Sequence, residues 1–265
     1  MNFKKELELA IEASVEAGKE ILKVYHSNDF AIETKKDNSP LTIADSNAHN
    51  KIMDYLSKID IPVLSEEGRE IPYEERKDWN LLWVVDPLDG TKEFIKKNGE
   101  FTVNIALIKN GTPIIGVIFV PVQNILYFGL EKIGAYKIEK FQANSFDLES
   151  LIEKAVKIPI QKTSKNYVAV GSRSHMSKET ELFFDSLKEK HGDIEIVSMG
   201  SSLKICLVAE GIADIYPRFA PTMEWDTAAG QGIAQAAGKS LIDYKTNQIM
   251  VYNRKILLNN WFIVK

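Results

Sequence analysis

The sequence predicts a mixed fold, with α+β layering in the first half of the chain and an alternating α/β arrangement in the second. Two segments with helical spacing of apolar residues come first, and a run of short apolar strands follows them. Strands then alternate with helices toward the C-terminus, which is typical of α/β layering. The 265 residues suffice for two closely packed domains, which we expect at residues 1–150 and 151–265.

The first half begins with two helices. Apolar residues from Phe3 to Tyr25 recur at helical spacing, and a second helix is expected over residues 43–56, with Asp45 in its first turn. Asn110 and Gly111 separate two strands and predict an antiparallel hairpin. Apolar, β-branched runs predict the strands at 61–64, 81–85, 103–108, 114–120 and 125–130.

The second half follows a polar stretch over residues 140–165, which we interpret as the crossover between the domains. Within that stretch, residues 141–162 carry no motif and no assigned role. The strands expected after it are 167–170, 194–197 and 212–216. The helices expected between and after them are 178–190, 202–210 and 224–237.

Composition excludes several function classes. A formal net charge of −4 argues against general nucleic-acid binding, which depends on basic surface. The single cysteine, Cys206, cannot form an intrachain disulfide and lies in an apolar helical run. No signal-peptide core and no apolar run near ~20 residues is present, so no integral membrane segment is expected. We expect a cytoplasmic monomer or homodimer, with peripheral attachment to the inner face of the cell membrane left open.

The most informative motif runs from Asp86 to Thr91, directly after the predicted strand 81–85. Pro87 fixes its own φ, and Gly90 allows close backbone approach, so two aspartates would project from a rigid turn. Two carboxylates held together indicate a cation between them, and oxygen ligands favour Mg²⁺. The four histidines lack zinc-ligand spacing, and the backbone N–H groups of Gly90 and Thr91 suit a phosphate.

Further motifs accompany this turn: Ser39-Pro40-Leu41-Thr42-Ile43-Ala44-Asp45, Ser65-Glu66-Glu67, and Trp225-Asp226-Thr227-Ala228-Ala229-Gly230. Together the four motifs resemble the signatures of the inositol monophosphatase superfamily, whose members are magnesium-dependent, lithium-sensitive phosphatases. The resemblance implies a layered αβαβα sandwich with the active site between two sheets.

The resemblance also implies the catalytic residues. The metal ligands would be Glu66, Asp86, Asp89, Asp226 and the backbone carbonyl of Leu88, holding two or three Mg²⁺ ions. Asp45 and Thr91 would position a water for in-line attack on phosphorus. Taken alone, Glu66 and Glu67 also fit a solvated acidic loop, and Asp45 and Asp226 also fit charges at helix N-termini. Glu67 is expected to support the ligands rather than join them.

Three local features favour the bisphosphate nucleotidase branch of this superfamily. Lys92-Glu93-Phe94 follows the Asp-Gly-Thr turn, and residues 171–175 resemble a nucleotide-contacting loop. Residues 200–204 and 216–219 resemble the part that binds a second phosphate. Physically, a helix N-terminus with serines and Lys204, faced by Arg218, would suit a phosphate that does not react. Lys36 fits either a phosphate anchor or a solvated basic pair, and His175 is assigned by resemblance alone.

The implied reaction is hydrolysis of the 3'-phosphate of adenosine 3',5'-bisphosphate to AMP and phosphate, within sulfur assimilation. The implied substrate contacts are Glu66, Leu88, Asp89, Gly90, Thr91, His175, Ser202, Lys204, Arg218 and Asp226. Two alternatives stay open: an inositol monophosphatase or related small phosphatase, and a catalytically silent sensor that binds Mg²⁺ and a nucleotide.

Overall fold

The computed structural model of the chain describes residues 3–27, 33–34, 40–142, 146–162, 166–171 and 177–265, with backbone alone at 33–34 and 40–41. The helices are α1 (Lys4–Ser27), α2 (Ile43–Leu56), α3 (Tyr73–Arg76), α4 (Thr91–Ile95), α5 (Leu148–Lys154), α6 (Lys178–His191), α7 (Leu203–Ala209) and α8 (Glu224–Ala236). The strands are β1 (Glu33–Thr34), β2 (Pro40–Leu41), β3 (Val63–Ser65), β4 (Leu81–Asp89), β5 (Thr102–Lys109), β6 (Thr112–Val120), β7 (Ile125–Leu130), β8 (Gly134–Ile138), β9 (Val156–Ile158), β10 (Tyr167–Gly171), β11 (Ile194–Ser198), β12 (Tyr216–Arg218), β13 (Leu241–Asp243), β14 (Gln248–Ile249) and β15 (Phe262–Val264).

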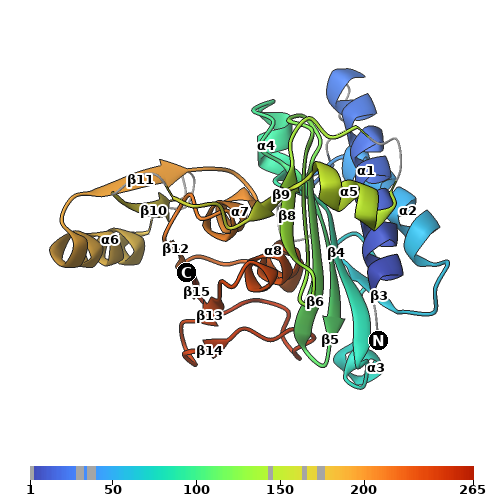
Figure 1. The fold of residues 1–265 in the computed structure, drawn as a ribbon. Helices are drawn as coiled ribbons and strands as arrows, with labels where there is room; N and C mark the ends of the chain where they lie inside the picture. Colours follow the sequence, from blue (N-terminus) through green and yellow to red (C-terminus); the bar gives the residue numbers. More distant parts are fainter. Residues whose placement is uncertain (1–2, 28–32, 35–39, 143–145, 163–165, 172–176) are drawn as a thin grey trace.

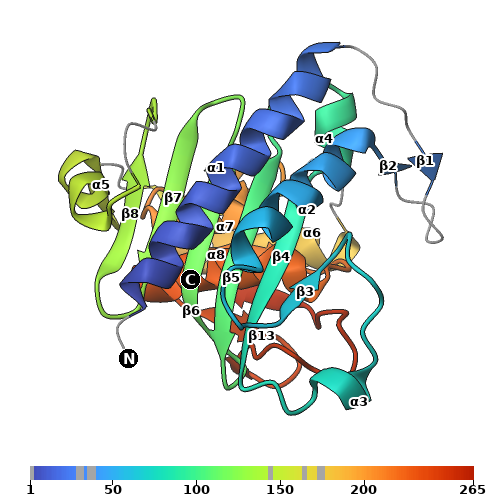
Figure 2. The same cartoon turned by 90° about the vertical axis from the view of Figure 1, so that its right-hand side faces the viewer.

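A seven-stranded sheet in the order β3-β4-β5-β6-β7-β8-β9 forms the central layer. Only the β3–β4 pair is parallel. Helices α1 and α2 cover one face, and α8 covers the other (Figures 1 and 2). Successive residues of β4 therefore enter different cores: Trp83 packs with α1 and α2, whereas Val84 packs with α7 and α8. Burial on both faces explains why the run reads as continuously apolar.

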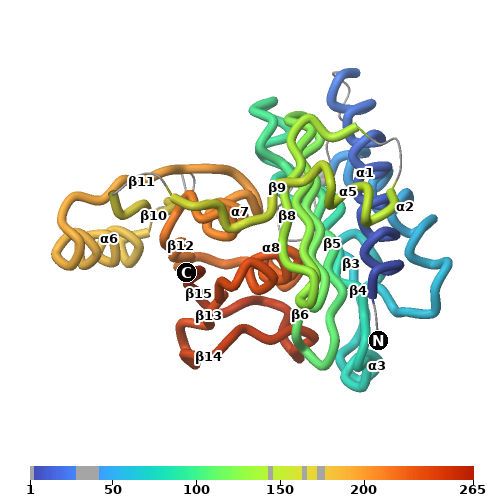
Figure 3. The backbone as a smooth tube through the Cα atoms, in the orientation of Figure 1, coloured from blue at the N-terminus to red at the C-terminus, as the bar shows by residue number. Residues whose placement is uncertain are grey.

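A second sheet, in the order β12-β15-β13-β14, lies on the far side of α7 and α8 (Figures 1 and 3). An isolated bridge between Ala169 and Ile215 joins it to the parallel pair β10–β11, against which α6 packs. Helix α8 approaches the central sheet closely, since a Cβ added at Gly116 would lie 2.1 Å from the carbonyl oxygen of Ala229. The layers run helix, sheet, helix, sheet, helix, so the expected αβαβα sandwich is confirmed.

Most predicted elements are confirmed within a few residues. Helix α2 has the predicted bounds, and Asn110 (φ 50°) and Gly111 (φ 78°) form the predicted hairpin turn. The predicted strand 212–216 is wrong, because the N–H groups of Ile212 and Ala213 bond back to the carbonyl of Leu207 and wrap the end of α7. Strand β12 starts only at Tyr216.

The polar stretch 140–165 holds more structure than its composition suggested. It contains α5, which contacts α1, and β9, which adds the last strand to the central sheet. The division of the chain at residue 150 stays a prediction. None of the described helices has the length and apolar content that crossing a membrane requires.

Candidate active site

A β-bulge at the end of β4 brings the two aspartates of the Asp-Pro-Leu-Asp motif to one face. Asp86 pairs with Asn104 of β5, and Asp89 pairs with Thr102, so three residue steps on β4 oppose two on β5. Asn104 and Thr102 share a face because side chains alternate along a strand. The extra residue therefore turns Asp89 to the side of Asp86, where a regular strand would place it opposite. Pro87 lies inside this irregular segment, where a missing N–H costs little.

Three carboxylates converge at this end of β4. Glu66, Asp86 and Asp226 each offer an oxygen, and these oxygens lie within 4.8 Å of one another. The N–H of Glu66 bonds to the carbonyl of Val85 (3.1 Å), which anchors the end of β3 beside β4. Asp226 occupies the first turn of α8, where its Oδ2 accepts the N–H of Met223 (2.8 Å). The cluster thus joins the central sheet to α8 in the second half of the chain.

The electrostatics of this cluster call for a cation. Burial raises the pKa of Asp86 well above its usual value, and the charges of Glu66, Asp89 and Asp226 raise it further. Desolvation and the neighbouring Asp89 likewise raise the pKa of Asp226. A divalent cation bound to these oxygens would reverse both effects. Carboxylate oxygens that converge in this way fit a metal ion such as Mg²⁺.

Asp89 is not part of that three-residue cluster, and its Oδ2 is held by protein donors. The hydroxyl of Ser202 lies 2.7 Å from Asp89 Oδ2, and Nδ2 of Asn104 lies 3.4 Å from it. Asn104 is fully buried and was missed by the sequence reasoning. A signal existed, since Thr102 and Asn104 are two buried polar residues on one face of β5, whose other residues on that face, Ala106 and Ile108, are apolar. Ser202, predicted to contact substrate, uses its hydroxyl for protein contacts in this structure.

Asp45 and Thr91, predicted to activate water, are brought together by the fold. Thr91 Oγ1 donates to Asp45 Oδ1 over 3.2 Å. Asp45 Oδ2 accepts both the N–H (2.8 Å) and the hydroxyl (2.6 Å) of Thr42, which closes a capping box at the start of α2. The carboxylate is 1% exposed, so its orientation is set by these partners.

Gly90 occupies a position that disfavours any side chain. Its φ is 95°, and an added Cβ would lie 2.2 Å from the hydroxyl oxygen of Ser201. That hydroxyl bonds to the carbonyls of Asp89 (2.7 Å) and Glu100 (2.9 Å). The close neighbour of Gly90 in this structure is therefore Ser201, and the predicted approach of its backbone to a bound phosphate stays a prediction.

Lys204 and Arg218, predicted to bind a second phosphate, are neighbouring cations. The pKa of Lys204 is lowered to about 8, chiefly by burial, with the charge of Asp89 opposing this shift and the charge of Arg218 adding to it. The Lys204 ammonium donates to the carbonyls of Ser201 (2.7 Å) and Met199 (3.2 Å), which leaves one of its three donors. Arg218 donates from Nη2 to Pro221, and its buried Nε has no hydrogen-bond partner among the described residues. Both side chains thus retain donors for an anion.

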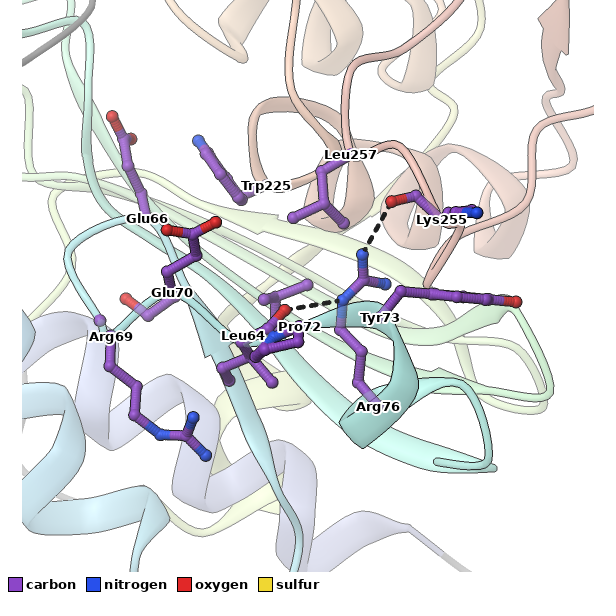
Figure 4. A pocket seen from close by; sticks show the side chains of 13 residues that line it. Leu64, Glu66, Arg69, Glu70, Pro72, Tyr73, Arg76, Trp225, Lys255 and Leu257 are labelled. Atoms are coloured by element: carbon purple, nitrogen blue, oxygen red, sulfur yellow. Dashed lines mark hydrogen bonds between the residues drawn. The ribbon is translucent and has the colours of Figure 1, made fainter.

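A pocket of about 420 Å³ opens beside Glu66. In Figure 4, Glu66 and Trp225 lie at one end of it, and Arg76 and Lys255 lie at the other. The Arg76 guanidinium is 2% exposed and bonds to the carbonyls of Ile71 and Lys255, so its donors serve the protein. Of the three clustered carboxylates, only Glu66 lines this pocket, which lies on the side of the segment after β3.

Some predicted residues are not placed by this geometry. His175 and Lys36 lie outside the described residues. Leu88 is 2% exposed with its side chain in the core beneath α1 and α2, and its N–H bonds to Asp86 Oδ1 (3.1 Å). The roles of its carbonyl and of Glu67 stay predictions.

Comparison with known proteins places this geometry in context. The model of the inositol monophosphatase family matches residues 3–264. The chain is 43% identical over 251 residues to the 3'(2'),5'-bisphosphate nucleotidase CysQ of Escherichia coli strain K12, covering 94% of each protein. It is 41% identical over 261 residues to the CysQ of Salmonella typhimurium, covering 97% of this chain and 98% of that one.

Solved structures agree. The crystal structure of CysQ from Bacteroides thetaiotaomicron superposes with a TM-score of 0.92 at 51% identity, covering 99% of this chain and 97% of the other. An IMPase from Thermotoga maritima shares the fold, with a TM-score of 0.74 at 22% identity over 98% of this chain and 92% of its own.

Proposed function

The chain belongs to the inositol monophosphatase family, and we propose that it is a Mg²⁺-dependent 3'(2'),5'-bisphosphate nucleotidase. It would hydrolyse the 3'-phosphate of adenosine 3',5'-bisphosphate to AMP and phosphate, a reaction that serves sulfur assimilation in the cytoplasm. One observation carries the choice of substrate. The structure pairs a carboxylate cluster that fits metal with two cations, Lys204 and Arg218, that keep donors for a second phosphate.

The metal ions would be held by Glu66, Asp86, Asp89 and Asp226, with the carbonyl of Leu88, as two or three Mg²⁺. When bound, Mg²⁺ neutralises the reacting phosphate and lowers the pKa of coordinated water. The chain's own contribution is to assemble the ligands from three elements: the end of β3, the bulge of β4 and the first turn of α8. The bisphosphate is an anion, so without compensating cations these carboxylates would repel it.

The attacking water would be oriented by Thr91 and Asp45. Because Thr91 donates its hydroxyl proton to Asp45 Oδ1, the lone pairs of Thr91 Oγ1 are available to accept a proton from water. As the water attacks phosphorus, its proton passes to Thr91 Oγ1 and the hydroxyl proton moves to Asp45 Oδ1. Thr42 holds Asp45 in place through two bonds to Oδ2, so the acceptor does not need to reorganise.

The 5'-phosphate, which does not react, would bind to Lys204 and Arg218. A phosphate accepts hydrogen bonds from charged donors strongly, and the buried Arg218 Nε is such a donor. The proposal extends to contacts from the Gly90 backbone and from His175, whereas the Ser202 hydroxyl bonds to Asp89 and to the Asp226 carbonyl. The monophosphate of a neutral polyol has no group for the Lys204 and Arg218 site.

Side-by-side turnover of adenosine 3',5'-bisphosphate and inositol 1-phosphate with Mg²⁺ tests the proposal. We expect kcat/KM for the bisphosphate to exceed kcat/KM for inositol 1-phosphate by at least about tenfold, which is the lower end of the effect of one charged hydrogen bond. A preference for inositol 1-phosphate would favour the inositol monophosphatase alternative. Binding of the bisphosphate without release of phosphate would favour a sensor.

A further inference from the structure

A directed chain of hydrogen bonds leads from the interior of β5 to Asp89. Thr102 Oγ1 donates to Asn104 Oδ1 (2.9 Å), and Asn104 Nδ2 donates to Ser202 Oγ (2.7 Å). Ser202 in turn donates to Asp89 Oδ2 (2.7 Å). Asn104 and Thr102 are fully buried and Ser202 is 2% exposed, so each bond forms away from competing water.

The direction of the chain follows from the chemistry of its members. The Ser202 hydroxyl has one proton and two acceptors, Asp89 Oδ2 at 2.7 Å and the Asp226 carbonyl at 3.1 Å, and the nearer, charged carboxylate is the stronger acceptor. The Ser202 oxygen in turn accepts from the amide of Asn104. The Asp89 carboxylate fixes which end of that amide is the donor, because it only accepts and lies 3.4 Å from Asn104 Nδ2, and the Thr102 hydroxyl then donates to Asn104 Oδ1. Asp89 Oδ2 therefore receives two donors, Ser202 and Asn104. Among the described residues, no hydrogen bond is directed at Asp89 Oδ1, which leaves this oxygen for a cation.

The Ser202 hydroxyl also connects the strands β4 and β5 with helix α8. Ser202 Oγ lies 3.1 Å from the backbone carbonyl of Asp226 in α8, besides its contacts with β4 and β5. A single side chain at the start of α7 thus touches two of the residues that the proposed function assigns to metal. The hydrogen bonds that lead to Ser202 also explain why Thr102 and Asn104, on one face of β5, are polar.

We propose that Ser202 and Asn104 are positioning residues that orient Asp89 for metal binding, rather than residues that contact substrate. This inference rests on the proposed function only in taking Asp89 as a metal ligand. Groups that orient metal ligands typically contribute 10–100-fold to metal affinity. Because Ser202 and Asn104 act on the same oxygen, their effects should not be additive.

The test is Mn²⁺ binding to the full chain in the absence of substrate, measured by electron paramagnetic resonance, for the wild type, Ser202→Ala and Asn104→Ala. We expect each variant to weaken Mn²⁺ binding by about tenfold or more, and the double variant to be little weaker than Ser202→Ala. Ser202→Thr, which keeps the hydroxyl, should restore binding. The matched control is Ser14→Ala, a fully buried serine of α1 whose hydroxyl bonds only to the Ile11 carbonyl.

A second readout separates positioning from substrate contact. With Ser202→Ala at saturating Mg²⁺, the ratio of kcat/KM for adenosine 3',5'-bisphosphate to that for 3'-AMP should stay at the wild-type value. A fall in this ratio with unchanged Mn²⁺ binding would overturn the inference. Loss of the folded circular-dichroism spectrum in both Ser202→Ala and Asn104→Ala would also overturn it, because these hydrogen bonds would then be required for folding rather than for orienting Asp89. If the wild type bound Mn²⁺ but released no phosphate, the proposed function would be refuted. The comparison of Mn²⁺ affinity between wild type and variants would still test the role of Ser202 and Asn104.

Discussion

Thr91 donates a hydrogen bond to Asp45 over 3.2 Å, and 46 positions of sequence separate the two residues. The bond joins the first residue of α4 to the first turn of α2, whose capping box already fixes the other carboxylate oxygen of Asp45. The carboxylate that caps the helix is therefore also the one to which we assign the role of proton acceptor.

Asp45→Asn should lower kcat by about two to four orders of magnitude while leaving KM nearly unchanged, because the variant keeps the cap but loses the proton acceptor. Thr91→Val should have an effect of the same order, since it removes the hydroxyl between water and Asp45. Thr91→Ser, which keeps the hydroxyl, serves as the control. Steady-state kinetics with Mg²⁺ checks this, and an Asp45→Asn enzyme within tenfold of wild type would contradict the assignment.

Asp86→Asn should abolish turnover and yet stabilise the metal-free protein. The pKa of Asp86 is raised in the folded state, so the folded protein loses stability as the pH rises above the usual carboxyl value toward the raised one. At neutral pH the amide removes that penalty. Thermal unfolding in a chelator should therefore give a higher Tm for Asp86→Asn than for wild type, and added Mg²⁺ should raise the Tm of wild type more. A lower Tm for the variant in chelator would show that the Asp86 charge is not the destabilising element.

Lys204→Ala and Arg218→Ala should each lower kcat/KM for adenosine 3',5'-bisphosphate by roughly ten- to a hundredfold, the worth of one charged hydrogen bond of about 1.5–3 kcal/mol. The loss for 3'-AMP, which lacks the second phosphate, should be small. Lys188→Ala, on the exposed surface of α6, is the control. Equal losses on both substrates would mean that these cations support the fold or the metal site.

The preference for the bisphosphate should fall as the pH rises through about 8, the lowered pKa of Lys204. Below that pH the ammonium is charged and can bind phosphate, and above it the neutral amine binds weakly. Because kcat/KM reports the free enzyme, the ratio of kcat/KM for the bisphosphate to that for 3'-AMP should show this pKa. Lys204→Met should give a ratio independent of pH over the same range. A wild-type ratio that is flat from pH 7 to 9 would contradict the role of Lys204.

Gly90→Ala should destabilise the protein by about 1–3 kcal/mol, because the residue combines positive φ with a contact of 2.2 Å to Ser201 Oγ. Gly238, which follows the C-cap residue of α8, offers a control: its φ of 77° is also positive, but an added Cβ would meet nothing within 4 Å. Gly238→Ala should therefore report the backbone cost of a positive φ without a contact and be the milder change in chemical denaturation. Equal effects of the two substitutions would mean that the contact with Ser201 relaxes freely.

Local sequence patterns predicted the residues of the candidate site better than they predicted the residues that hold those side chains in place. Asp45, Glu66, Asp86 and Asp226 each lie in a short continuous motif. The fold places Asp45 in a hydrogen bond with Thr91 and clusters the other three carboxylates. The link from Asn104 to Ser202 spans 98 positions, so no local pattern contains it. The bulge that turns Asp89 toward Asp86 is likewise a property of pairing with β5 and not of β4 alone.

The secondary structure shows the same contrast between elements with a local sequence signal and elements without one. Helix α2 carries its own capping box and periodicity, so its bounds could be read from the sequence. Strands β13, β14 and β15 are two or three residues long, too short for a periodic pattern, and β15 pairs with the distant β12. The run 212–216 has strand-like composition, but the N–H groups of Ile212 and Ala213 bond back to Leu207 and close the end of α7. In these cases backbone hydrogen bonds that the local sequence pattern does not encode decided the structure.

Phosphorus NMR of the reaction with adenosine 3',5'-bisphosphate and Mg²⁺ tests the proposed 3'-nucleotidase activity, because it identifies which ester bond breaks. We expect the 3'-phosphate signal to disappear, the signal of inorganic phosphate to appear, and the 5'-phosphate signal of AMP to remain, and we expect chelator to prevent these changes. Release of the 5'-phosphate to give 3'-AMP, or an unchanged spectrum, would contradict it.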